Sequence, residues 1–92
     1  MLGKRINELR TSCCWSQVEL AKRLNVSKQT VSNWENDNIL PSIEMLVKLA
    51  GVFNVTTDYL LGKENVPRLN VDGLSKQAVA HISMLIDDLR SK

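Results

Sequence analysis

The fold of this chain is decided by residues 17–36, which read QVELAKRLNVSKQTVSNWEN. Apolar side chains recur there at helical spacing, first over residues 17–24 and again from residue 28, which predicts two short helices. Only three residues, Asn25, Val26 and Ser27, are left to connect them. Asparagine is the commonest residue after glycine in the left-handed conformation that ends a helix, so we expect a sharp turn at Asn25.

The second of these helices, residues 28–36, has two different faces. Val31 and Trp34 share the face that we expect to pack against the first helix. The opposite face is polar and almost free of acids, whereas an ordinary exposed helix carries Glu–Lys pairs. Its amide and hydroxyl groups can donate and accept hydrogen bonds at base edges, and lysine can contact guanine. This face consists of Lys28, Gln29, Ser32, Asn33 and Asn36.

Helix start signals divide the rest of the chain. Each is an apolar residue followed by Ser or Thr, with a second apolar residue four positions after the hydroxyl residue; the hydroxyl can accept a bond from a free N–H of the first turn. Four such signals lie at Ser16, Ser27, Thr56 and Ser75, and Glu19 completes a capping box with Ser16. The expected helices span residues 2–12, 17–24, 28–36, a stretch from Pro41-Ser42 to about 53, 57–61 and 75–90, with no strand.

Length and composition exclude several classes of protein. The 92 residues give room for one compact domain and one further element. No apolar run approaches the roughly 20 residues that cross a membrane, and no signal peptide is visible, so we expect a cytoplasmic protein that does not bind membranes. The chain shows no nucleophile–base pair, carboxylate pair or glycine-rich phosphate loop, so we do not expect an enzyme.

The cysteines and the histidine suggest neither a disulfide nor a metal site. Cys13 and Cys14 are adjacent and cannot join distant segments, so we expect reduced thiols that pack inertly, with a redox sensor as the less favoured alternative. His81 lies far from them in sequence, which leaves no set of metal ligands. We therefore expect no cofactor and no metal.

Positive charge is concentrated in the first part of the chain. The net charge is only +2 at pH 7. Residues 1–36 carry six basic and three acidic side chains, whereas residues 37–62 carry one basic and three acidic side chains. A phosphate backbone would be met by the basic part, although an unevenly charged solvated surface explains the same pattern equally well.

Residues 2–62 as a whole resemble the Xre or Cro-repressor family of helix-turn-helix proteins. Ser16–Ala21 is similar to the start of that family's second helix, and Val26–Glu35 to its turn and recognition helix. Pro41, Leu46, Leu49-Ala50 and Asp58–Gly62 look like its closing helices. Two departures are Asn25, where glycine is usual, and the Cys13-Cys14-Trp15 approach to the second helix. The resemblance implies a five-helix domain that binds operator DNA, usually as a dimer.

The same resemblance implies roles for individual residues. Gln17 is expected to contact a phosphate, which agrees with its place at a helix N-terminus. Lys28, Gln29 and Asn33 match base-contacting positions, Asn36 matches a backbone-contacting position, and Arg10 and Glu35 match a structural ion pair. Neighbouring residues extend the predicted site: we assign base contact also to Thr30 and Ser32, and phosphate contact to Ser27 and Asn38.

The last expected helix, within residues 74–92, carries an apolar stripe. Its spacing of four, three and four residues is typical of a coiled-coil seam and favours pairing with a second chain; the alternative is that the stripe packs on its own domain. Residues 63–73, with Pro67 and Gly73, are expected to link it to a DNA-binding domain of residues 1–62. The predicted dimer interface is Leu74, Ala78, Ile82, Leu85, Ile86 and Leu89.

Two functions of different classes follow from these features. The first is a homodimeric, sequence-specific transcriptional regulator, with repression favoured, that binds a palindromic operator in double-stranded DNA. The second is an antitoxin-like interaction module that binds an unidentified protein partner and its own promoter.

Overall fold

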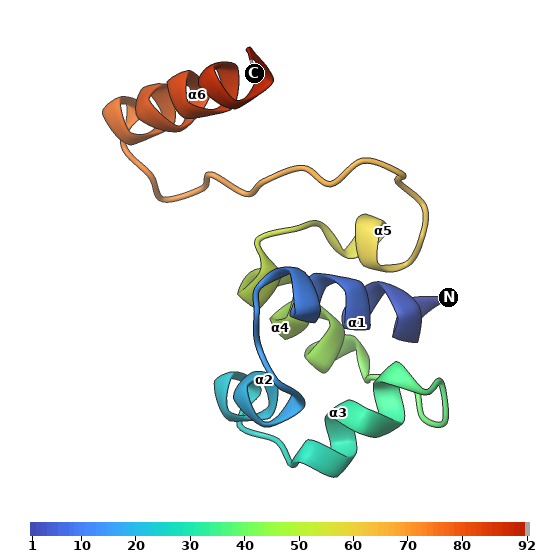
Figure 1. The fold of residues 1–92 in the computed structure, drawn as a ribbon. Coiled ribbons are helices and arrows are strands. Elements are labelled where there is room, and N and C mark those ends of the chain that lie inside the picture. The colour runs from blue at the N-terminus through green and yellow to red at the C-terminus, as the bar shows by residue number, and fades with distance from the viewer. Residues whose placement is uncertain (92) are drawn as a thin grey trace.

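The computed structural model describes residues 1–91, and these contain six α-helices and no strand (Figure 1). Lys92, the last residue of the predicted segment 74–92, lies outside the described residues. The expected all-helical fold, five helices followed by a C-terminal helix, is confirmed. The helices are α1 (Leu2–Ser12), α2 (Gln17–Leu24), α3 (Lys28–Glu35), α4 (Ile43–Phe53), α5 (Thr57–Leu60) and α6 (Lys76–Arg90).

Five of the six helices begin at a hydroxyl residue that caps them. In each, the side-chain oxygen accepts a bond from the backbone N–H three residues later, at 3.0–3.1 Å. The caps have extended backbones and lie outside their helices, so α4 and α6 begin slightly later than expected. The expected capping box is wrong in one respect: the Glu19 carboxylate does not return to the Ser16 backbone but lies 3.9 Å from Arg23 Nε. The caps are Ser16, Ser27, Ser42, Thr56 and Ser75.

Helices α1 to α5 all end in the same type of turn. A residue with positive φ follows the last turn, and the next backbone N–H donates to the carbonyl five residues earlier, at 2.8–3.2 Å. This is the Schellman arrangement, which satisfies carbonyls that the helix leaves free. Asn25, with φ 57°, confirms the predicted turn between α2 and α3. The five left-handed residues are Cys14, Asn25, Asp37, Asn54 and Gly62.

Each of these five helices contributes one fully buried side chain to a shared core. Trp34 of α3 and Phe53 of α4 are also buried and belong to the same core. Burial of Val31 and Trp34 orients α3 so that its polar face points away from the core. The five fully buried side chains are Ile6, Leu20, Val31, Leu49 and Leu60.

Gly3 lies where α1 passes close to the end of α3. A Cβ at this position would lie 2.5 Å from the Trp34 carbonyl oxygen and 2.6 Å from that of Glu35. The Gly3 N–H also donates to Asp37 Oδ1 at 3.0 Å, and Asp37 is the left-handed residue that follows α3. The absence of a side chain therefore lets α1 fix the turn that leaves α3.

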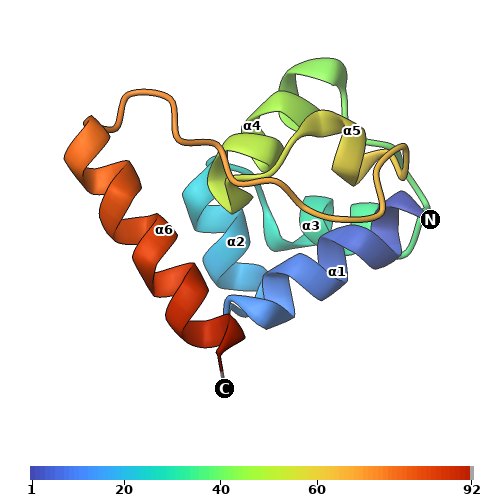
Figure 2. The same cartoon turned by 90° about the horizontal axis from the view of Figure 1, so that it is seen from above.

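The segment that follows α5 runs past α4 to reach α6 (Figure 2). Its start is held by Arg5, which lies over the Tyr59 ring at 4.0 Å and donates to the Glu64 carbonyl oxygen at 3.4 Å. Further along, the Asn70 N–H donates to the Asn54 carbonyl oxygen at 3.4 Å. Helix α6 stands apart from the five-helix body in Figure 1 and contains no buried residue. Among residues 1–91, no helix is both long and apolar enough to cross a membrane.

Candidate nucleic-acid interface

Helix α3 lies at the edge of the molecule opposite α6 (Figure 1). Its polar face is directed outward, because Val31 and Trp34 on its other face are buried. Lys28 and Gln29 are exposed, and Thr30, Ser32 and Asn33 are partly exposed. The one acidic residue of α3, Glu35, does not belong to this outward face. The structure therefore brings all five predicted base-contacting residues to one helix that carries no exposed carboxylate.

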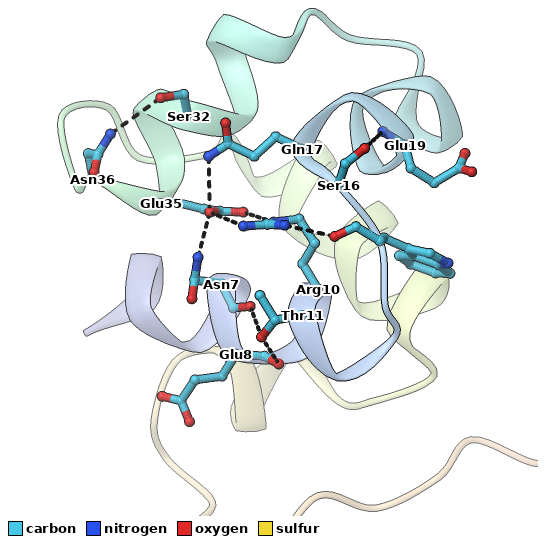
Figure 3. Close-up of polar contacts among 11 residues, drawn as sticks. Asn7, Glu8, Arg10, Thr11, Ser16, Gln17, Glu19, Ser32, Glu35 and Asn36 are labelled. Atoms are coloured by element: carbon cyan, nitrogen blue, oxygen red, sulfur yellow. Dashed lines mark hydrogen bonds and ion pairs between the residues drawn. The ribbon is translucent and has the colours of Figure 1, made fainter.

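Polar side chains on and around α3 bond to one another along the helix. The Gln29 Nε2 donates to Asn33 Oδ1 at 3.1 Å, one turn away. In the same way the Asn36 Nδ2 donates to Ser32 Oγ at 3.3 Å (Figure 3). These contacts restrain side chains that would otherwise lose rotamer freedom on meeting a ligand.

Glu35 joins three helices beneath this surface (Figure 3). The Arg10 guanidinium of α1 contacts its carboxylate twice, with Nε to Oε2 at 2.6 Å and Nη2 to Oε1 at 3.1 Å. Asn7 Nδ2 and Gln17 Nε2 donate to the same Oε1 at 2.9 Å and 3.2 Å. The side chains of Arg10 and Glu35 are only 12% and 4% exposed. The ion pair implied by the family resemblance is thus present and nearly buried. Gln17 and Asn7 add hydrogen bonds to it, so four residues form one cluster.

The charge of Glu35 is stabilised by these partners. Burial by itself raises the pKa of the Glu35 carboxyl. Hydrogen bonds from Arg10, Asn7 and Gln17, together with the positive charge of Arg10, outweigh burial and hold the pKa below its ordinary value. Glu35 is therefore ionised at neutral pH, and its negative charge is neutralised inside the domain.

The predicted phosphate contacts lie at the start of α2 and at both ends of α3. Gln17 is the first residue of α2, and its amide is held by Glu35. Ser27 caps α3, and its hydroxyl also lies 2.8 Å from Thr30 Oγ1. Asn36 and Asn38 are exposed in the turn after α3. The five-helix body thus places polar groups at both ends of the outward face of α3.

Two contacts in this region were not expected from the sequence. Asn7 lies one turn before Arg10, so helical spacing was a signal that it shares the face of Arg10. For Trp15 the sequence indicated only an apolar residue before the Ser16 cap. It stacks on Phe53 of α4, with ring centroids 5.8 Å apart, while the Arg23 guanidinium lies 4.1 Å from its centroid. Trp15 thereby joins α2 to α4.

The expectation that the cysteines pack inside the protein is wrong. Cys13 and Cys14 are both exposed. Cys14 is the left-handed residue that ends α1, with φ 60°, and its N–H donates to the Thr11 carbonyl oxygen at 2.9 Å. The two residues form the turn into α2, so their backbones bear the structural role.

The predicted dimer residues of α6 divide into two groups. Leu85 and Leu89 are 58% and 62% exposed. Ala78, Ile82 and Ile86 are partly buried. Ile82 and Leu74, the latter itself exposed, line a groove of about 290 Å³ together with residues 69–72 and Asn54. One edge of the apolar stripe therefore faces the chain's own linker, and the other edge has no cover within residues 1–91.

Comparison with known proteins identifies the family of this chain. Residues 6–60, which include α2, α3 and the turn between them, match the model of the helix-turn-helix family. The chain belongs to the Xre-type helix-turn-helix family. Over 88 residues it is 41% identical to the HTH-type transcriptional regulator ImmR of Bacillus subtilis, a match that covers 95% of this chain and 69% of ImmR. It is 29% identical over 65 residues to the immunity repressor of Bacillus phage phi105, covering 71% of this chain and 45% of that repressor.

Solved structures agree with the architecture. SinR, described as the master regulator for biofilm formation and solved in complex with DNA, is 35% identical with a TM-score of 0.62; the match covers 66% of this chain and 98% of that one. A chain from the structure of a SinR–SinI complex is 26% identical with a TM-score of 0.64, and the match covers 100% of this chain and 100% of that one. This chain is thus a DNA-binding transcriptional regulator, and the relatives described above are regulators rather than enzymes.

Proposed function

We propose that this chain is a repressor that binds a palindromic operator as a homodimer. The observation that carries the proposal is the outward face of α3, where amide, hydroxyl and lysine side chains stand exposed while the one carboxylate of the helix is buried and paired. A helix with that chemistry fits the major groove, where each base pair presents its own pattern of donors and acceptors. Lys28, Gln29, Thr30, Ser32 and Asn33 supply the base contacts.

The ends of two helices supply the phosphate contacts. Gln17 stands at the start of α2 and Ser27 at the start of α3, where free backbone N–H groups favour an anion. Asn36 and Asn38 extend the contact beyond α3. The amide nitrogen of Gln17 carries two N–H bonds, and the bond to Glu35 uses one of them. The other is free to meet a phosphate oxygen.

Dimerisation is assigned to α6. In this arrangement residues 1–62 bind DNA, residues 63–73 form the linker and residues 74–92 carry the interface. Its apolar stripe is open at Leu85 and Leu89, and a second copy of the helix would cover it. Two α3 helices would then lie about one DNA turn apart, roughly 34 Å, on an operator with matching symmetry. This function places the protein with the DNA, which for a bacterial regulator is the cytoplasm.

A second candidate function rests on the same open stripe. The relative SinR forms a complex with the SinI protein. In this chain the open stripe of α6 is a surface that a different protein would cover. An antitoxin-like module would use α6 in that way and bind its own promoter through α3. Co-purification of the chain with a tightly bound second protein, in place of a self-associated chain, would favour this function.

Selection of bound sequences from random DNA tests the proposed function most directly. We expect one enriched motif with two-fold symmetry. Titration of that motif at several salt concentrations should show affinity falling steeply with salt, because phosphate contacts release counterions. A pool that stays random, or a flat salt response, would refute operator binding by this chain.

A further inference from the structure

The hydrogen bond between Gln29 and Asn33 limits what each side chain can offer to a base. It joins Gln29 Nε2 to Asn33 Oδ1 at 3.1 Å, across one turn on the outward face of α3. Among the side chains of residues 1–91, these two amides bond only to each other. An amide presents two N–H donors and a carbonyl oxygen with two lone pairs. The bond therefore uses one donor of Gln29 and one lone pair of Asn33, and it fixes the direction in which each amide is turned.

Gln29 keeps the pair of groups that suits adenine. The bond to Asn33 uses one N–H and leaves the second N–H and the carbonyl oxygen Oε1. Adenine presents an acceptor at N7 and a donor at N6 in the major groove, and an amide meets both at once. The bond to Asn33 therefore holds the Gln29 amide without removing either group that adenine needs.

Asn33 keeps its donors rather than its acceptor for a base. Its carbonyl oxygen is turned toward Gln29, so its amide nitrogen is the group available for a base edge. Donors suit guanine, with acceptors at N7 and O6, and thymine, with an acceptor at O4. Adenine fits less well, because its N7 acceptor lies beside the N6 donor, toward which Asn33 turns no acceptor. Cytosine presents only the N4 donor there and is disfavoured.

We propose that Asn33 is a positioning residue for Gln29: it holds the Gln29 amide ready for adenine and itself selects guanine or thymine through its amide nitrogen. This inference rests on the proposed function of α3 and adds base identities to it. Two neighbouring positions of the operator are then coupled, because one side chain sets the preference at both.

The experiment is selection from random DNA with the full chain and four variants. Gln29→Ala identifies the base position that Gln29 contacts. Asn33→Ala removes the acceptor for Gln29, so adenine preference at the Gln29 position should fall by about fivefold or more, a part of what a bidentate pair contributes. Asn33→Ser is a second variant without the amide, in case Asn33→Ala does not fold. The fourth variant, described next, keeps the acceptor.

Asn33→Asp retains an oxygen that accepts from Gln29 and loses both donors. Adenine preference at the Gln29 position should survive. The base at the Asn33 position should change from guanine or thymine to cytosine, because a carboxylate accepts a hydrogen bond from the cytosine N4 amino group. The added charge lowers overall affinity for DNA, so the measured quantity is relative base preference within each selected pool. Thermal melts show whether each variant is folded.

The outcomes separate this inference from the proposed function. Loss of adenine preference in Asn33→Ala, with its retention in Asn33→Asp, supports the positioning role. If the wild type enriches a motif but adenine preference is the same in Asn33→Ala, or cytosine stands at the Asn33 position of the wild-type motif, the inference fails and operator binding stands. If the wild type enriches no motif, both fail.

Discussion

Helices α3 and α6 both expose a face to solvent, but for opposite reasons. The apolar side of the eight-residue α3 is buried within its own domain, and its polar face is left over. The fifteen-residue α6 buries no residue, and its apolar stripe is left over. An exposed polar face is stable as it stands and can exchange water for a polar ligand, whereas an exposed apolar stripe is stabilised by any partner that covers it. This contrast supports the proposals that α3 contacts DNA and that α6 contacts protein.

The largest effect should come from the buried ion pair that holds α3. Glu35→Ala leaves the Arg10 guanidinium, only 12% exposed, without its carboxylate. We expect a loss of about 3–5 kcal/mol in the free energy of unfolding, because one charge remains buried and unpaired. Thermal or urea unfolding measures it. Glu19→Ala is the control, since that carboxylate pairs with Arg23 at the surface and should contribute at most about 1 kcal/mol. Equal losses in both variants would contradict a special role for the buried pair.

The apolar stripe of α6 should give the next largest effect, and on assembly rather than on folding. Ile82→Asp with Leu85→Asp should prevent dimerisation and weaken operator affinity by about 100-fold or more, because joining two domains makes the second DNA contact effectively intramolecular. Sedimentation and DNA titration measure both quantities. Gln77→Asp with Ala80→Asp adds the same charge to the opposite face of α6 and serves as the control.

A chain that ends at Arg68 adds a second test of α6. It should stay monomeric and bind DNA weakly. If this truncated chain still dimerises fully, or the wild type is monomeric at tens of micromolar, the dimer surface lies elsewhere and the contrast between α3 and α6 is wrong.

Signals close in sequence were enough to predict most of the fold. A hydroxyl cap or the left-handed Asn25 acts on backbone groups within one helical turn, so the helix bounds fell within one or two residues of those observed. Contacts between distant residues were harder to predict. Gly3 and Asp37 are 34 residues apart, and their bond depends on how closely α1 crosses the end of α3.

The candidate site shows the same limit. Spacing of 3.6 residues per turn predicts which residues share the outer face of α3, because that face is a property of one helix. Asn7 was missed as a partner of Glu35, since its place depends on the packing of α1 against α3. The stripe of α6 shows a different limit, because the same spacing suits packing against its own domain and pairing with another chain.

Substitution of two glutamines, Gln29 and Gln17, should distinguish base contact from phosphate contact. Gln29→Ala should cost about 1–3 kcal/mol at one base position and relax specificity there. Gln17→Ala should weaken binding to all sequences alike, because a phosphate carries no sequence information. Titration of the selected operator and of its single-base variants measures both. The same base profile in the two variants would show that the roles are assigned wrongly.

Acid should release part of the stabilisation that Glu35 provides. Because the folded state holds the pKa of Glu35 below its ordinary value, its contribution is complete above the unfolded pKa of about 4.3 and is lost as pH falls through the lower folded pKa. Unfolding free energy measured from pH 6 down to pH 2 should therefore decline more steeply in the wild type than in Glu35→Gln. Parallel curves would contradict this contribution.

The smallest effect should come from the turn between α2 and α3. Asn25 has φ 57° and ψ 46°, a conformation that costs most residues roughly 1–2 kcal/mol and glycine almost nothing. Asn25→Gly should change the free energy of unfolding by less than about 1 kcal/mol, because relief of strain is offset by the greater freedom of glycine in the unfolded chain. Asn25→Ala should lose about 1 kcal/mol or more, since alanine has neither advantage. Dimerisation should be unchanged in both variants, because the turn lies on the α3 side of the molecule, far in sequence from α6. Chemical unfolding together with sedimentation measures this pair, and a shift in oligomeric state for either variant would show that the two regions are coupled.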